Sequence, residues 1–62
     1  MENYFTIKSE NLERLKIKVR SLDSLRFLSN PEELSDNKYR ICLSGTPEDF
    51  NILNKYREEN LN

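Results

Sequence analysis

The residues of this chain that could do chemistry are mostly basic. Between Arg14 and Arg20 every second residue is Lys or Arg, and the residues between them are Leu, Ile and Val. A period of two places the two kinds of side chain on opposite faces of a β-strand. A strand over 14–20 would therefore place a row of positive charges on one face of a sheet, where they could bind phosphates or an acidic protein surface.

Other predicted strands would add an aromatic side chain and further cations to the same face. Tyr4 could stack on a base, as aromatic residues do in proteins that bind single strands on a sheet. The partner-binding residues predicted for this basic sheet face are Tyr4, Lys8, Lys16, Lys18, Arg20, Arg26 and Arg40. The alternative without a partner is that long basic side chains keep an open sheet in solution and oppose pairing of its edges.

The residues that most enzymes and metal sites need are scarce. The chain has no His, one Cys and one Gly. Without His it lacks the usual near-neutral general base and the commonest metal ligand. One Cys without His cannot form an activated thiol pair or a structural zinc site, and one Gly cannot form a glycine-rich phosphate loop. The sequence therefore predicts a protein that is not an enzyme and holds neither a metal nor a cofactor.

Length and composition bound the architecture. A chain of 62 residues with a net charge of −1 predicts one small domain, 1–62, with a narrow margin of stability. The lone Cys42 excludes an internal disulfide and fits a reducing compartment. No apolar run is long enough to span a membrane, and the first residues do not form a secretory leader. We therefore expect a cytoplasmic protein that does not enter a membrane.

The clearest local signals lie in the last third of the chain. Apolar and polar residues alternate over 38–44, which predicts a strand. Gly45 follows, and we expect it to supply a backbone conformation that a residue with a Cβ would resist. Thr46 then has the features of a helix N-cap and Pro47 those of a first helical residue, so a helix is predicted over 47–60.

The remaining segments complete a predicted α+β fold. Aromatic and β-branched residues favour a strand at 4–8, and Leu25 and Phe27, which would both point inward, favour another at 25–29. Asn30-Pro31-Glu32 predicts a helical turn, which Ser35-Asp36-Asn37 would end. The predicted architecture is a small antiparallel sheet of three to four strands, at about 4–8, 14–20, 25–29 and 38–44, with the helix 47–60 packed on one face.

One segment, 12–22, fits two structures. Its Leu and Val residues also recur at spacings of three and four, which predicts a helix at 11–22, started by Asn11, and a β-α-β-β-α order. Ile17 favours the strand, because on that helix it would lie among charged residues, whereas a strand would bury it with its neighbours.

These observations predict a small regulator or inhibitor that works by binding another protein. The alternative is a nucleic-acid-binding module that uses the basic sheet face, although such domains usually carry a marked basic excess. A homodimer joined by edge strands or by the last helix is compatible with either function. The many Asn, Lys, Glu and Ile residues suit an origin on an AT-rich phage, plasmid or bacterial genome.

Overall fold

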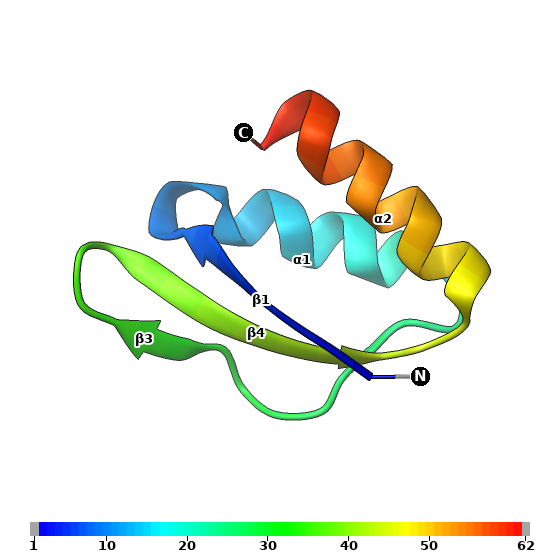
Figure 1. Ribbon diagram of the computed structural model, residues 1–62, viewed down its shortest axis with the longest axis horizontal. Helices are drawn as coiled ribbons and strands as arrows, with labels where there is room; N and C mark the ends of the chain where they lie inside the picture. The colour runs from blue at the N-terminus through cyan, green and yellow to red at the C-terminus, as the bar shows by residue number, and fades with distance from the viewer. Residues whose placement is uncertain (1, 62) are drawn as a thin grey trace.

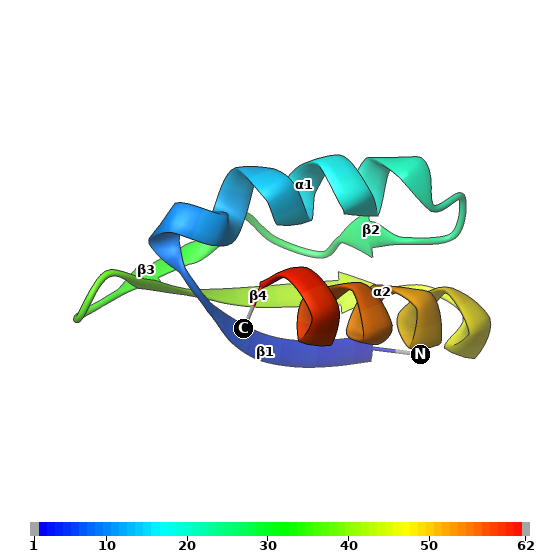
Figure 2. The ribbon, with the colours of Figure 1, turned by 90° about the horizontal axis from the view of Figure 1, so that it is seen from above.

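The computed structural model describes residues 2–61 and has two layers, a small antiparallel sheet and a pair of helices that cover one of its faces (Figures 1 and 2). The class is α+β, as predicted. In chain order the elements are β1 (Glu2–Lys8), the 3-10 turn η1 (Ser9–Asn11), α1 (Leu12–Ser21), β2 (Arg26–Phe27), β3 (Glu32–Leu34), β4 (Lys38–Ser44) and α2 (Pro47–Asn60).

Strand β4 is the centre of the sheet. It pairs antiparallel with β1 along its whole length, from Glu2 opposite Ser44 to Lys8 opposite Lys38. On its other side it pairs with both short strands, β2 and β3. Helix α1 lies over the β2 side of this sheet and α2 over the β1 side, as the view from above shows (Figure 2).

The strand predicted over 14–20 is wrong, and the alternative helix is confirmed. Residues Leu12–Ser21 form α1, which buries Leu15 and Val19 against the sheet. Ile17, the residue that favoured a strand, is 65% exposed. A single exposed apolar side chain costs little. The apolar residues of α1 at spacings of three and four, by contrast, cover the β2 side of the sheet.

The start of α1 differs from the expected side-chain cap. Asn11 occupies the N-cap position, but its side chain makes no capping hydrogen bond. The side-chain Nδ2 of Asn11 instead donates to the carbonyl oxygen of Leu61 at 3.1 Å. Asn11 therefore joins the beginning of α1 to the end of α2.

The bounds predicted for β4 and α2 are confirmed. Thr46 caps α2, and its hydroxyl accepts from the amide of Asp49 at 3.3 Å. Gly45 has a different role from the one expected, since its φ is not positive. A Cβ at this position would lie 2.5 Å from Cδ2 of Leu25 and 3.2 Å from the carbonyl oxygen of Ser24. Gly45 is therefore required for the close approach of two segments.

The helical turn predicted after Pro31 is also wrong, because Glu32–Leu34 form strand β3. Asp36 and Asn37 both have positive φ, at 66° and 58°. These residue types tolerate the left-handed region better than most. The turn they form folds β3 back on β4, so pairing with β4 overrides the helix-start pattern.

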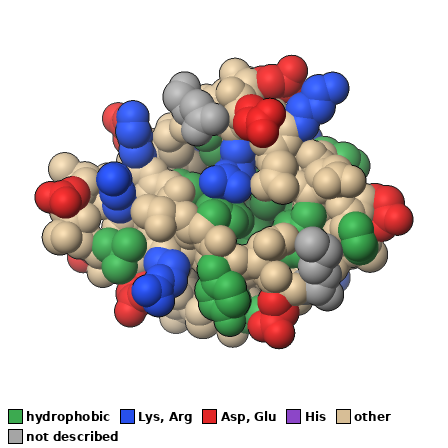
Figure 3. Space-filling view, in the orientation of Figure 1, with side chains coloured by type: hydrophobic (Ala, Val, Ile, Leu, Met, Phe, Trp, Pro, Cys, Tyr) green, Lys and Arg blue, Asp and Glu red, His purple; other side chains and the backbone are tan. Residues whose placement is uncertain are grey.

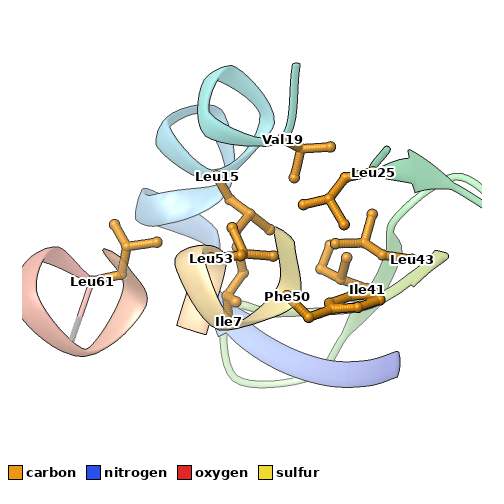
Figure 4. Packing of buried hydrophobic residues seen from close by; sticks show 9 residues of the cluster. All are labelled: Ile7, Leu15, Val19, Leu25, Ile41, Leu43, Phe50, Leu53 and Leu61. Carbon is orange, nitrogen blue, oxygen red and sulfur yellow. The ribbon is translucent and has the colours of Figure 1, made fainter. Parts of the chain in front are cut away.

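The hydrophobic core lies between the sheet and the two helices (Figure 4). Every element except η1 and β3 borders it. Its buried residues are Ile7, Leu15, Val19, Leu25, Ile41, Leu43, Phe50, Leu53 and Leu61. At roughly 1.5–3 kcal/mol for each fully buried aliphatic or Phe side chain, this cluster is the main source of stability.

Candidate functional site

The seven residues predicted to form one basic sheet face are divided between the sheet and helix α1. Tyr4, Lys8 and Arg40 lie on strands of the sheet, and Arg26 lies on β2 at its edge. Lys16, Lys18 and Arg20 lie on α1 instead, in the layer on the other side of the sheet. The predicted surface therefore does not exist as a single face, because its central strand is a helix.

The open sheet face is the side of the sheet that points away from the helices. Residues opposite one another in an antiparallel pair share a face, and Ile41 and Leu43 face the helices. By this register the open sheet face carries Glu2, Tyr4, Thr6, Lys8, Arg26, Glu32, Leu34, Lys38, Arg40, Cys42 and Ser44.

The charges of the open sheet face are mixed. Glu32 lies opposite Arg40, and their Oε1 and Nε atoms are 3.7 Å apart. Acidic and basic side chains are similarly interspersed on the side of the molecule seen in Figure 3. The open sheet face is therefore not the strongly basic surface that the sequence predicted.

Two large apolar side chains stand out at the margin of a shallow depression on the open sheet face. Tyr4 is 67% exposed and Leu28, just after β2, is 48% exposed. The depression has a volume of about 530 Å³ and is lined by both of them and by Cys42. The pKa of Tyr4 is raised, because hydrogen bonding to Cys42 favours the protonated hydroxyl and because negative charge on Cys42 and Glu2 opposes its ionisation.

A second concave surface, which we call the basic groove, lies between α1 and the β2 edge of the sheet. It has a volume of about 440 Å³. Its lining residues are Lys16, Val19, Arg20, Leu25, Arg26, Phe27, Asn30 and Pro31. Three of these are cations, four are apolar, and none is a carboxylate.

The cations of the basic groove differ in how firmly they are held. The Nη1 atom of Arg26 donates to the carbonyl oxygens of Asp23 and Leu25, both at 2.8 Å. These two bonds fix one end of the guanidinium and leave its other donors for a ligand. Lys16 lies 3.6 Å from Glu13, a carboxylate whose side chain is 78% exposed. A pair this exposed neutralises Lys16 only weakly.

Lys18, the remaining predicted residue, has a structural contact. Its Nζ lies 5.3 Å from the centroid of the Tyr56 ring of α2. This is a cation–π distance, and it connects the two helices. Lys18 does not line the basic groove or the open sheet face.

The apolar floor of the basic groove, formed by Val19, Leu25, Phe27 and Pro31, was not predicted from the sequence. Val19 and Leu25 are buried, at 2% exposure each, and Phe27 is partly exposed. The available signal was the helical alternative for 12–22, since a helix places Lys16 and Arg20 on one side at a spacing of four.

Within residues 2–61, neither α1 nor α2 has the length and apolar character needed to cross a bilayer. The same residues include no cluster of three or more His, Cys, Asp or Glu side chains placed to hold a metal ion. Comparison of the chain with protein-family models, with curated proteins and with solved structures finds no match.

Proposed function

We propose that this protein is a non-enzymatic, cytoplasmic regulator or inhibitor that binds another protein, and that the basic groove is where it does so. The partner would present an acidic segment that carries one large apolar side chain. The observation that carries the proposal is the composition of the groove, where Lys16, Arg20 and Arg26 surround an apolar floor without any lining carboxylate.

The two parts of the groove serve different steps of binding. The cations complement Asp or Glu side chains, which speeds encounter and selects among partners. The apolar floor, which includes Phe27 and Pro31, gives a partner's Leu, Phe or Trp a surface to be buried against, and such anchors supply most of the affinity at protein interfaces. Because Arg26 is already held by two carbonyl oxygens, little side-chain entropy is lost when it binds.

Nucleic acid is the second candidate, favoured by the same three cations, and the geometry supports it less well. Single-strand binders combine cations with aromatic residues on which bases stack. Here the exposed aromatic Tyr4 lies on the open sheet face, whereas Lys16 and Arg20 lie in the helix layer. The net charge of −1 also contrasts with the basic excess of most nucleic-acid-binding domains.

A selection from a random peptide library tests the proposal directly. We expect the selected peptides to carry Asp or Glu beside a large apolar residue. The double variant Arg20→Glu/Arg26→Glu should weaken their binding at least about tenfold, because two attractive contacts become repulsive. Fluorescence anisotropy with the labelled peptide and with a labelled single-stranded oligonucleotide measures both candidate ligands.

The matched control is Arg14→Glu combined with Lys55→Glu, which makes the same charge change at exposed positions outside the groove. This control should leave peptide binding within about twofold of wild type, since distant surface charges are screened by salt. Equal losses in the two double variants would contradict the groove. Tight oligonucleotide binding that Arg20→Glu/Arg26→Glu abolishes, without peptide binding, would establish the nucleic-acid function instead.

A further inference from the structure

Strand β1 is an edge of the sheet. In the order β1-β4-β2, its seven residues pair with β4 on one side alone. Seen from above, β1 runs along one border of the described chain, with no element drawn beyond it (Figure 2). It contains no Pro, and its charges are confined to its two ends, Glu2 and Lys8. An edge of this kind can accept another strand through its unpaired N–H and C=O groups.

The sequence of β1 is complementary to itself. If a second copy of β1 paired antiparallel about a two-fold axis through Phe5, Glu2 of each copy would lie opposite Lys8 of the other. In the same register Tyr4 would lie opposite Thr6, so side chains of the open sheet face in one copy would lie beside side chains of the open sheet face in the other. All seven residues of β1 would be paired, and both end charges would be matched.

Within one copy of the chain, Lys8 lies beside a like charge. Lys8 lies directly opposite Lys38 in the β1–β4 pair, and like charges in that position are destabilising. Among residues 2–61 the ion pairs are Lys16–Glu13 and Arg40–Glu32, so neither Glu2 nor Lys8 takes part in one. A second copy would place a carboxylate on the other side of Lys8.

We propose that the free edge of β1 joins two copies of this chain into a symmetric dimer with one continuous sheet. The two-fold axis is perpendicular to the sheet, so both helix layers lie on the same side and the two α2 helices flank the joint. Both copies contribute the same surface to this interface, as in other dimers with a two-fold axis. It is independent of the proposed function, because the basic groove lies at the opposite edge of the sheet, beside β2.

A charge-swap series in sedimentation equilibrium tests this pairing. Wild type should dimerise with a dissociation constant below roughly 1 mM, the weak end of measurable association. Glu2→Lys and Lys8→Glu should each weaken the dimer at least about tenfold, since each places like charges opposite one another at both ends of the interface. The double variant Glu2→Lys/Lys8→Glu should recover wild-type association.

The decisive sample is an equimolar mixture of the two single variants. Each variant alone has equal charges at positions 2 and 8, yet in a mixed pair every such position faces the opposite charge. The mixture should therefore dimerise about as well as wild type, a result that a folding defect cannot produce. Glu10→Lys and Lys55→Glu, the same changes at exposed positions off β1, should leave association unchanged.

Three results would overturn the proposal. The first is a wild-type protein that stays monomeric to about 1 mM, which excludes all but the weakest association. The second is a dimer that neither single variant weakens, which would place the interface elsewhere. The third is a mixture of the single variants that associates no better than each variant alone.

Discussion

Ser24 donates two hydrogen bonds to the same carboxylate oxygen of Asp49, from its amide at 3.0 Å and from its hydroxyl at 2.5 Å. The Ser24 hydroxyl oxygen also accepts from the amide of Thr46 at 3.0 Å. The segment between α1 and β2 is thereby tied to the first turn of α2. These bonds hold the segment that follows α1 against the start of α2, where Gly45 permits the two segments to approach closely.

The first prediction concerns acid stability. The bonds from Ser24 lower the pKa of Asp49 below its ordinary value of 3.8, because they stabilise the charged carboxylate. In the unfolded chain Asp49 therefore takes up its proton at a higher pH than in the folded chain. The stabilisation is complete above the unfolded pKa and is lost as the pH falls through the folded pKa.

Asp49→Asn should flatten the dependence of the unfolding free energy on pH between about pH 5 and pH 2, the range in which a lowered carboxyl pKa acts. Urea unfolding followed by circular dichroism at a series of pH values measures this slope. Glu48→Gln, a change at the exposed neighbouring acid, is the control. Equal slopes for wild type and Asp49→Asn would contradict the role given to Ser24.

The second prediction is that Gly45→Ala destabilises the fold by about 1–3 kcal/mol, the usual cost of inserting a methyl group into a packed site. The new Cβ would meet Cδ2 of Leu25, a buried core atom, and the backbone of Ser24. Urea unfolding measures the loss. Ser44→Ala, at the preceding and partly exposed position, should change stability by less than about 0.5 kcal/mol. Wild-type stability in Gly45→Ala would show that the two segments separate without cost.

The third prediction distinguishes the helix from the strand at residues 12–21. Leu15→Ala should cost about 2–5 kcal/mol, because a fully buried Leu leaves a cavity. Ile17→Lys should change the free energy of unfolding by no more than about 0.5 kcal/mol, because Ile17 is in water. In a strand both side chains would be buried, so a large loss in Ile17→Lys would argue against α1.

The fourth prediction concerns the contact between α2 and the edge strand. The guanidinium carbon of Arg57 lies 3.9 Å from the centroid of the Phe5 ring, and burial lowers the pKa of Arg57. Arg57→Gln should cost about 0.5–1 kcal/mol through loss of the cation–π attraction. Arg57→Ala should cost more, because it also removes the apolar stem. Arg14→Gln, at an exposed position on α1, is the control. An Arg57→Gln protein as stable as wild type would contradict the cation–π attraction between Arg57 and Phe5.

The parts of the fold that the sequence predicts are those with self-contained local signals. Strand β4 alternates without interruption, and α2 has its cap at Thr46, its Pro47 and its apolar stripe in one stretch. Strand β3 has no such signal, because Glu32–Leu34 becomes a strand only through pairing with β4. The sequence of α1 fits both the period of a strand and the period of a helix. The helix forms because it covers apolar residues of the sheet, and this depends on the whole fold and not on the local sequence.

The candidate site is less accessible from sequence than the fold. Tyr4, Lys8, Arg26 and Arg40 share the open sheet face as predicted, because each belongs to a segment that was correctly predicted to be a strand. The basic groove depends on where α1 crosses above β2, a tertiary relationship that no local pattern encodes. Its cations were named from the sequence, but their arrangement around Phe27 and Pro31 was not.

The central place of β4 sets the order of events when the chain is made. Within residues 2–61, β1, β2 and β3 all pair with β4 alone, and β4 (Lys38–Ser44) follows all three of them in the chain. During synthesis β1 therefore has no strand to pair with until β4, which begins 30 residues after β1 ends, has also been made. Only α1 can begin to form in that interval, and long-range pairing of this kind slows folding. The sheet therefore assembles only after Lys38–Ser44 has been made, although all three strands that pair with β4 precede it in the chain.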